Sequence, residues 1–269
     1  MNTLQIKNHQ PVPISEIPIF DYAAFYAIAV NLCANRENHI ANYYAYQTST
    51  FLKFICCIAE DKDATIHVFS HELSDFNHAL AIDAISKEVF AFHIFEREIS
   101  ENYGIQFLNH PWDKPARLAF DRADKSKTLR NYPFLRLQGD EIHEVGVGPI
   151  HAGVIEPGHF RFLCNGEMVM HLEIQLGYQH RGIEKLFLSK KHLIQRTVLS
   201  ESIAGDTAVG HSLAFVGAME SLLGFEPNAR LNMIRTLALE LERMAIHVGD
   251  LSAFCLDVAY QLGLSLIHI

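Results

Sequence analysis

The chain has 269 residues, 49% of them hydrophobic, and a formal net charge of −9 at pH 7. This is the composition of a globular protein with enough apolar residues for a sizeable core, in one large domain or two ordinary ones. An acidic chain without a long basic run lacks the charge pattern of a free-standing nucleic-acid-binding protein, so we expect its partners to be proteins or small molecules.

The cysteines and the N-terminus indicate the compartment. The five cysteines, at 33, 56, 57, 164 and 255, are irregularly spaced and form no C-x-x-C motif. This argues against a disulfide framework and against a zinc or iron–sulfur site built by this chain alone. The N-terminus shows no secretory signal, and no stretch approaches the ~20 apolar residues that cross a bilayer. We therefore expect a reducing cytoplasm, with any membrane contact made through a partner.

The first part of the chain is typical of an α/β domain. We expect a helix over 14–34 that opens near Ser15. Three strands rich in aromatic and β-branched residues follow, at 39–47, 51–60 and 64–70. Cys56 and Cys57 lie inside the second strand, where neighbouring side chains point to opposite faces, so at least one is expected to be a small buried hydrophobic residue.

A second helix is expected over 86–105, capped by Ser86 and ended by Gly104. The segment 110–134 contains three prolines and many charges without clear periodicity. This pattern indicates a linker or a wrapping segment, and we place the domain boundary near 125–145.

A β-hairpin is the clearest prediction for the second part. Apolar residues alternate over 160–164 and again over 168–176, on either side of Asn165-Gly166. Asn-Gly between alternating runs indicates a hairpin with a type I′ turn, whose two central residues both take positive φ.

Helices follow the hairpin. We expect them over about 181–200, over about 205–223 with an end at Gly224, and from Pro227 to about 262. The whole pattern predicts an α+β fold, with a small N-terminal α/β domain followed by a β-hairpin and a bundle of long helices. The expected parts are a domain over 1–125, a linker over 126–145 and a second domain over 146–269.

The chain lacks the short motifs of self-contained nucleotide and hydrolase sites, such as G-x-G-x-x-G after a strand, G-x-x-x-x-G-K-[ST], G-x-S-x-G and H-E-x-x-H. Candidates for chemistry lie instead in the Gly- and Pro-rich segment before the hairpin. There His151, Glu156 and His159 can exchange protons near neutral pH, although a plain exposed loop is the other interpretation. Arg181 follows the hairpin, and its alternative interpretation is a surface pair with Glu184.

Four stretches carry a family resemblance: GPIHAGVIEPGHFRF, HLEIQLGYQHRGIEKLF, GDTAVGHSLAF and LALELERMAIHVGDLSAFCLD. Together they resemble the large subunit of membrane-bound, energy-converting NiFe hydrogenases, a family homologous to the quinone-site (D-type) subunit of respiratory complex I (NADH-quinone oxidoreductase). The stretch FEREISENYGIQFLNHPWDKPARL resembles the C-type domain of complex I that is often fused upstream. The resemblance is good over roughly 85–269 and looser over the first 85 residues.

The resemblance bears on metal binding through the segment 202–212. In hydrogenases of this family the matching stretch has two cysteines that bind nickel and iron. In this chain they fall on Ala204 and Thr207, which offer no thiolate. The quinone-contacting tyrosine of the complex I relatives falls on Gly205. The resemblance thus implies a nickel-free, hydrogenase-like branch with no metal on this chain.

The family's large subunits continue well beyond the point that matches residue 269, and their second C-x-x-C lies there. We therefore expect the sequence to be a truncated product, a fragment or half of a split subunit. The resemblance otherwise implies an oxidoreductase subunit of a complex I-like or hydrogenase-like assembly that is not active alone. The implied cavity-lining candidates are His151, Glu156, His159, Arg181, Asp206 and His211.

In such an assembly, electrons would arrive from iron–sulfur clusters on a small partner subunit, and further partners would be membrane subunits. Proton transfer by His or Glu and charge stabilisation by Arg181 are the expected roles. A quinone is the candidate ligand, and no cofactor is assigned to this chain itself. The expected location is peripheral, on the cytoplasmic face of the cytoplasmic membrane. The alternatives are a non-catalytic scaffold subunit and a truncated, inactive fragment of such a complex.

Overall fold

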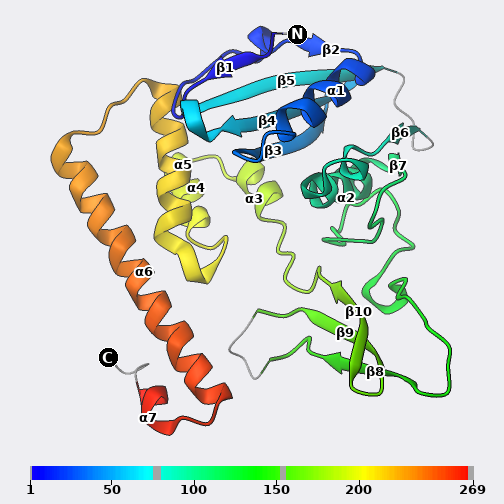
Figure 1. Ribbon diagram of the computed structural model, residues 1–269. Helices are drawn as coiled ribbons and strands as arrows, with labels where there is room; N and C mark the ends of the chain where they lie inside the picture. The colour runs from blue at the N-terminus through cyan, green and yellow to red at the C-terminus, as the bar shows by residue number, and fades with distance from the viewer. Residues whose placement is uncertain (1, 75–79, 152–155, 266–269) are drawn as a thin grey trace. The chain divides into compact units, whose positions relative to one another are not determined.

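The structure is a computed structural model that describes residues 2–74, 80–151 and 156–265. It has the predicted α+β fold, and the chain divides into two compact units, 1–181 and 182–269 (Figure 1). The first unit contains the strands, and the second is helical. The expected division into a C-type domain over 1–125, a linker over 126–145 and a hydrogenase-like domain over 146–269 stays a prediction.

The first unit is built on a sheet with the strand order β1-β5-β4-β3, in which β2 pairs with β5 in parallel. The strands are β1 (Leu4–Ile6), β2 (Ile19–Phe20), β3 (Asn38–Gln47), β4 (Phe51–Glu60) and β5 (Thr65–Ser74). The three long strands form an antiparallel meander at the predicted positions. Cys56 is fully buried and Cys57 only half-buried, which confirms that they point to opposite faces of β4.

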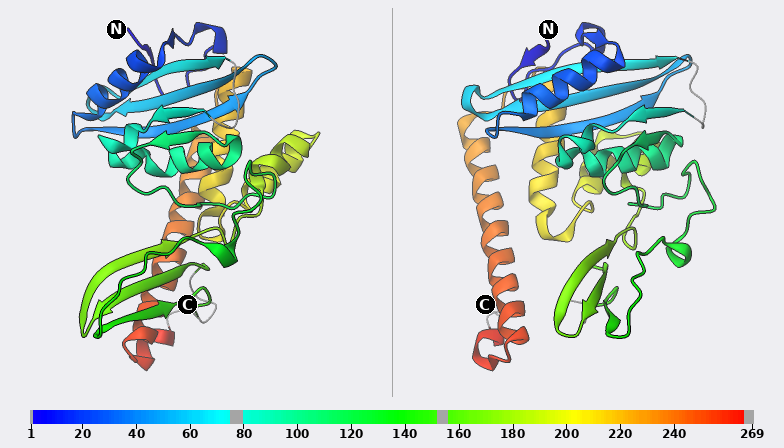
Figure 2. Two further views of the ribbon diagram at one scale, coloured as in Figure 1. Left: turned by 90° about the vertical axis from the view of Figure 1, so that its right-hand side faces the viewer. Right: turned by 45° about the vertical axis from the view of Figure 1, so that its right-hand side comes forward.

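One face of this sheet carries the hydrophobic core. Helices α1 (Tyr22–Cys33) and α2 (His93–Tyr103) contribute to the same cluster of buried side chains as β4 and β5. Phe25, Phe54, Phe69 and Phe92 are all 0% exposed, and Figure 2 shows α1 lying along the sheet. Each such side chain contributes roughly 2–3 kcal/mol by leaving water, so this cluster is the main source of the unit's stability.

The expected helix over 14–34 is wrong in its first third. Residues Ile14–Glu16 form one 3₁₀ turn, η1, and the helix begins only at Tyr22, where Asp21 caps it by accepting from the Ala24 N–H at 2.8 Å. The reason is Pro18, which cannot donate within a helix. Its carbonyl instead accepts from the Ser70 N–H at 2.9 Å, which ties this segment to the sheet.

The expected helix over 86–105 is likewise shorter and preceded by two 3₁₀ turns, η3 (Ile85–Lys87) and η4 (Phe90–Phe92). Ser86 does not cap it, because its N–H belongs to η3 and donates to a carboxylate of the helix itself. Gly104 ends α2 with a φ of +73°, as predicted.

The segment after α2 wraps around the unit with little regular structure. Strands β6 (Ala81–Asp83) and β7 (Gln106–Leu108) pair in parallel, and one 3₁₀ turn, η5, covers Leu129–Asn131. The wrapping segment is held by α2. Glu101 accepts three backbone N–H bonds, from residues 116, 117 and 118, at 2.9–3.1 Å. Arg97 donates to the carbonyls of Lys114 and Pro115. Polar anchors thus replace secondary structure in this region.

A second sheet has the antiparallel order β10-β9-β8. The predicted hairpin is confirmed as β9 (His159–Asn165) and β10 (Met168–Gln175), but the type I′ turn on Asn165-Gly166 is wrong. Asn165 pairs with Met168, so the central residues are Gly166 and Glu167, and of these only Gly166 has positive φ, +57°. Strand β8 (Ile142–Val147) was not expected.

The second unit is a series of helices. They are α3 (Ile183–Ser189), α4 (Leu193–Ser200), η6 (Gly205–Thr207), α5 (Ala208–Leu223), α6 (Ala229–Asp257) and α7 (Gln261–Leu264). The expected helix over 181–200 is broken at 190–192. Gly224 ends α5 in the left-handed region, as predicted, and Asn228 caps α6 by accepting from the Leu231 N–H at 2.9 Å. None of the helices in the described part of the chain is sufficiently long and apolar to cross a bilayer.

Candidate functional site

The first group of predicted site residues lies in the loop that joins β8 to β9. Because these two strands pair, the two ends of the loop, at Gly148 and Gly158, lie close together; we call them the base of the loop. His151 Nε2 lies 2.8 Å from the Gly158 carbonyl oxygen, to which it donates as the Nε2–H tautomer. Gly148 has a φ of +85°, and a Cβ atom there would overlap the Gly158 oxygen and crowd His151. A glycine is therefore required at position 148 for the two ends of the loop to approach this closely.

His159 lies at the start of β9, directly after this base. Its ring contacts the Phe134 ring edge-on at 5.7 Å, and its Nδ1 is buried without a hydrogen-bond partner. Arg161, two residues along the strand, forms an ion pair with Glu144 of β8 and stacks over Phe134. His151 and His159 are thus brought to one end of the second sheet.

Two further predicted site residues are Glu156 and Arg181. The Glu156 side chain is exposed, and the loop residues 152–155 lie outside the described part of the chain. Arg181 is exposed at the end of the first unit. The roles proposed for these residues stay predictions.

Asp206 and His211 lie in the second unit, around the N-terminus of α5. Asp206 is exposed in η6, and His211 is half-buried in the first turn of α5. Thr207 is the N-cap residue of α5, but its side chain makes no capping hydrogen bond. Instead Glu242, from α6, accepts from the Val209 N–H at 2.6 Å and from the Gly210 N–H at 3.1 Å. That the loop of the second sheet faces this segment stays a prediction.

The residues at the family's nickel positions do not fit a nickel–iron centre. Ala204 has no donor atom, and the Thr207 hydroxyl packs against Gly210, where a Cβ atom would overlap it. Soft metal sites of this kind need thiolates. Within residues 2–74, 80–151 and 156–265, no cluster of three or more His, Cys, Asp or Glu side chains is arranged to hold a metal ion.

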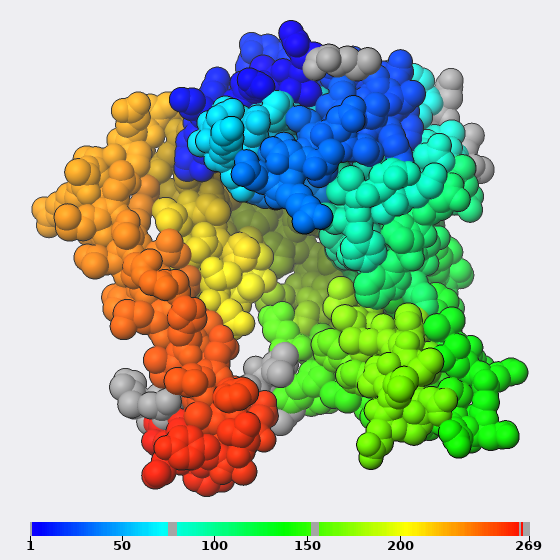
Figure 3. Space-filling model, viewed as in Figure 1, coloured from blue at the N-terminus to red at the C-terminus, as the bar shows by residue number. Residues whose placement is uncertain are grey.

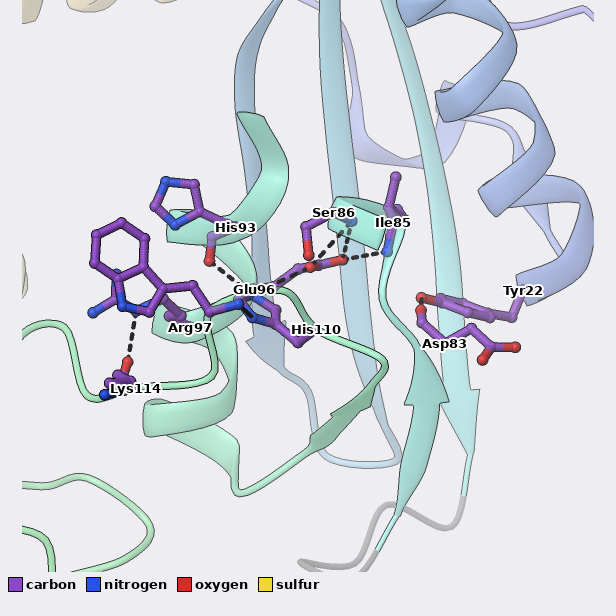
Figure 4. Close-up of polar contacts among 10 residues, drawn as sticks. Tyr22, Asp83, Ile85, Ser86, His93, Glu96, Arg97, His110 and Lys114 are labelled. Atoms are coloured by element: carbon purple, nitrogen blue, oxygen red, sulfur yellow. Dashed lines mark hydrogen bonds and ion pairs between the residues drawn. The ribbon is translucent and has the colours of Figure 1, made fainter. Parts of the chain in front are cut away.

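A separate polar centre, which the sequence analysis did not single out, is buried beneath α2 (Figure 4). The Glu96 carboxylate is 0% exposed and accepts from the Ile85 N–H at 2.6 Å and more weakly from the Ser86 N–H. His110 approaches it, with 3.6 Å between His110 Nε2 and Glu96 Oε2. Two backbone groups orient the His110 ring. Its Nε2 lies 3.1 Å from the His93 carbonyl oxygen, and the backbone N–H of Trp112 donates to its Nδ1 at 2.9 Å.

Burial decides the protonation of this centre. It raises the pKa of Glu96 from 4.5 to about 7 against the opposing effect of the hydrogen bonds from η3. Burial also lowers the pKa of His110 below 6.5. Both shifts favour the neutral forms of the two groups, and the Glu96 carboxyl is about half protonated near pH 7.

Sequence reasoning missed Glu96 and Glu242 because each is a charged residue inside a helix with ordinary surface-like spacing. Their partners are backbone N–H groups 10 to 33 residues away. Helical spacing was the available signal for Glu242. It lies seven residues after Arg235 and four after Ala238, so the three residues share one side of α6, and this side is half-buried.

No protein-family model matches the chain. Curated proteins do: it is 33% identical over 154 residues, 57% of its length, to hydrogenase-4 component G of Escherichia coli. It is 30% identical over 186 residues, 62% of its length, to formate hydrogenlyase subunit 5 of the same organism. A third relative is the C/D subunit of NADH-quinone oxidoreductase from Bacteroides thetaiotaomicron, at 28% identity over 196 residues and 61% of the chain. The matches cover 28%, 33% and 37% of these proteins, so the chain spans about a third of the relatives' length.

Proposed function

The chain belongs to the superfamily that unites energy-converting hydrogenases with complex I, and on this premise we propose that it is an oxidoreductase subunit of a membrane-associated assembly. Its relatives are components or subunits of larger complexes by name, which supports a role among partner subunits. We further propose that a small iron–sulfur subunit and membrane subunits are these partners. The assembly would lie on the cytoplasmic face of the membrane.

The observation that carries the proposal is the closed loop between β8 and β9. A loop built by Gly148 and the hydrogen bond from His151 to Gly158 holds His151 and His159 in fixed positions. Histidine changes protonation near neutral pH, so a fixed pair suits proton delivery to a redox reaction. In the proposal this loop lines the cavity in which a quinone is reduced, and Arg181 stabilises the developing negative charge.

Nickel–iron chemistry is not part of the proposal, because Ala204 and Thr207 do not fit it. Electrons would come from clusters on the neighbouring subunit. The residues of this chain would bind and orient the acceptor, exclude water and supply protons.

The test uses the intact assembly, isolated through a tag on this chain. His151→Gln and Glu156→Gln are compared with His143→Gln, an exposed histidine on β8 that serves as the matched control. Quinone and viologen reduction are measured with hydrogen, formate and NADH as donors. We expect a loss of turnover of about a hundredfold or more for the first two variants in complexes that retain all their partners, because general acid–base catalysis supplies roughly 10²–10⁴-fold. Unchanged turnover in both would contradict the proposal.

A second candidate, a non-catalytic scaffold, is favoured by the exposed apolar side of α6. Leu237, Leu241 and Met244 are 58–65% exposed, and exposed apolar surfaces of this kind mark sites of protein contact. The same experiment separates the two functions, because a scaffold keeps turnover in the loop variants and loses assembly when α6 is altered.

A further inference from the structure

Helices α5 and α6 form an antiparallel pair (Figure 1), and the contact between them is unusual in its chemistry. Along one side of α6, half-buried residues recur at helical spacing, at 231, 235, 238, 242, 246, 249 and 253. Such a stripe is normally apolar. Here it contains Arg235 and Glu242, and each makes polar contacts with α5.

The two contacts hold opposite ends of α5. The Arg235 guanidinium donates two hydrogen bonds, at 2.8 and 2.6 Å, to the Glu220 carboxylate near the C-terminal end. The Glu242 carboxylate accepts two hydrogen bonds from the N-terminal end, where Val209 and Gly210 are the second and third residues of the helix. Because charge-assisted bonds with paired geometry are strong and directional, together they define how far one helix can slide along the other.

Apolar packing between the two helices is incomplete. Between the two polar contacts lies a hollow of about 380 Å³, bordered by Leu213 and Val216 of α5 and by Ile234 and Ala238 of α6. A well-packed core leaves few voids and therefore permits one arrangement. A contact that is open and contains small residues permits several arrangements of the two helices. The register therefore depends on the polar contacts.

We propose that Glu242 is a positioning residue that fixes where α5 begins and so where Asp206 and His211 lie. The first N–H groups of a helix have no partner within it, and the N-cap side chain ordinarily supplies one. Thr207 does not, and Glu242 supplies it from another helix. Gly210 permits this close arrangement, since a Cβ atom there would overlap the Thr207 hydroxyl. The positioning of α5 by Glu242 is independent of the proposed function. Only a chemical role for Asp206 and His211 rests on it.

The experiment compares three variants at one position in the full chain. Glu242→Ala removes both acceptors, Glu242→Met keeps the volume without an acceptor, and Glu242→Gln keeps one acceptor. Glu240→Gln is the matched control, because Glu240 lies on the exposed side of α6 and pairs with Arg243. Amide hydrogen exchange is measured at residue resolution for Val209 and Gly210.

We expect about tenfold or greater acceleration of exchange at both amides in the Ala and Met variants, a smaller acceleration in the Gln variant and none in the control. Equal exchange rates in the Met and Gln variants would show that side-chain volume matters rather than hydrogen bonding, and this would overturn the inference. Unchanged exchange in the Ala variant would also overturn it. Turnover of the assembled complex is then measured for the Gln and Met variants. Accelerated exchange with unchanged turnover would support the positioning of α5 and contradict the expectation that Asp206 and His211 line the cavity.

Discussion

The two compact units differ in where their apolar side chains lie. In the first unit, Phe25, Phe54 and Phe69 are completely buried between a helix and a sheet. In the second, the apolar residues Leu237, Leu241 and Met244 of α6 are more than half exposed. They belong to a stripe that repeats every three or four residues, at 234, 237, 241, 244, 248 and 251, on the helix that Figure 3 shows in orange to red.

Such a stripe is the pattern with which one helix packs against another. The first unit thus carries its own core, whereas the second depends on polar contacts such as those of Glu242 and Arg235. The stability of the chain should therefore be concentrated in the sheet.

Phe69→Ala should lower the free energy of unfolding of the first unit by about 3–5 kcal/mol, because the side chain is 0% exposed and its loss leaves a cavity in the core. Urea denaturation followed by circular dichroism measures this. A loss below about 1 kcal/mol would show that the sheet does not depend on this cluster.

Glu96→Gln should change the pH dependence of stability. The carboxyl has a pKa of about 7 in the folded chain against an ordinary 4.5, so the folded state binds more protons between these values. The contribution of Glu96 to stability is therefore greatest below pH 4.5, falls as the pH rises to about 7 and is level above it. The variant lacks this fall and should gain about 3 kcal/mol relative to wild type across the window.

Chemical denaturation at several pH values checks the Glu96 prediction. Glu88→Gln serves as the control, because the Glu88 side chain is 50% exposed and should leave the profile unchanged. Parallel profiles for wild type and Glu96→Gln would contradict the prediction.

Gly166→Ala should cost about 1–2 kcal/mol. The residue has a φ of +57°, and an added Cβ atom meets nothing within 4 Å, so the cost is the left-handed backbone alone. Thermal unfolding of the variant is compared with Glu167→Ala, the neighbouring turn residue without positive φ. Equal stability of the two variants would contradict this account of the turn.

Leu241→Gln should change the free energy of unfolding by no more than about 0.5 kcal/mol, because the side chain is already 65% exposed. The same denaturation experiment applies. A loss above about 2 kcal/mol would show that the stripe is covered in the folded chain, and the contrast between the units would fail.

Much of the regular structure could be predicted from local pattern. The long strands of the first sheet, the hairpin and the ends of helices at Gly104 and Gly224 follow from alternation and from glycine's freedom to take positive φ. The missed strand β8 contains Gly146 and two polar residues, His143 and Glu144, and it is stabilised by its pairing with β9 rather than by its own sequence.

The polar anchors could not be predicted in this way. Glu96, Glu101 and Glu242 each bind backbone N–H groups of distant segments, so their roles depend on where the chain folds back. Of the predicted site residues, His151 and His159 are brought to one end of the second sheet. Their chemical roles, with those of Glu156, Arg181, Asp206 and His211, stay predictions.

The single tryptophan of the chain gives the buried polar centre an optical reporter. Trp112 stacks on His93 with 5.6 Å between ring centroids, and the Arg97 guanidinium lies 5.2 Å above it. A protonated imidazole quenches indole emission far more than a neutral one, and burial lowers the pKa of His93. The intrinsic fluorescence of the unmodified chain should therefore brighten as the pH is raised from acid, at a pH below 6.5, and it reports on this centre without any attached dye.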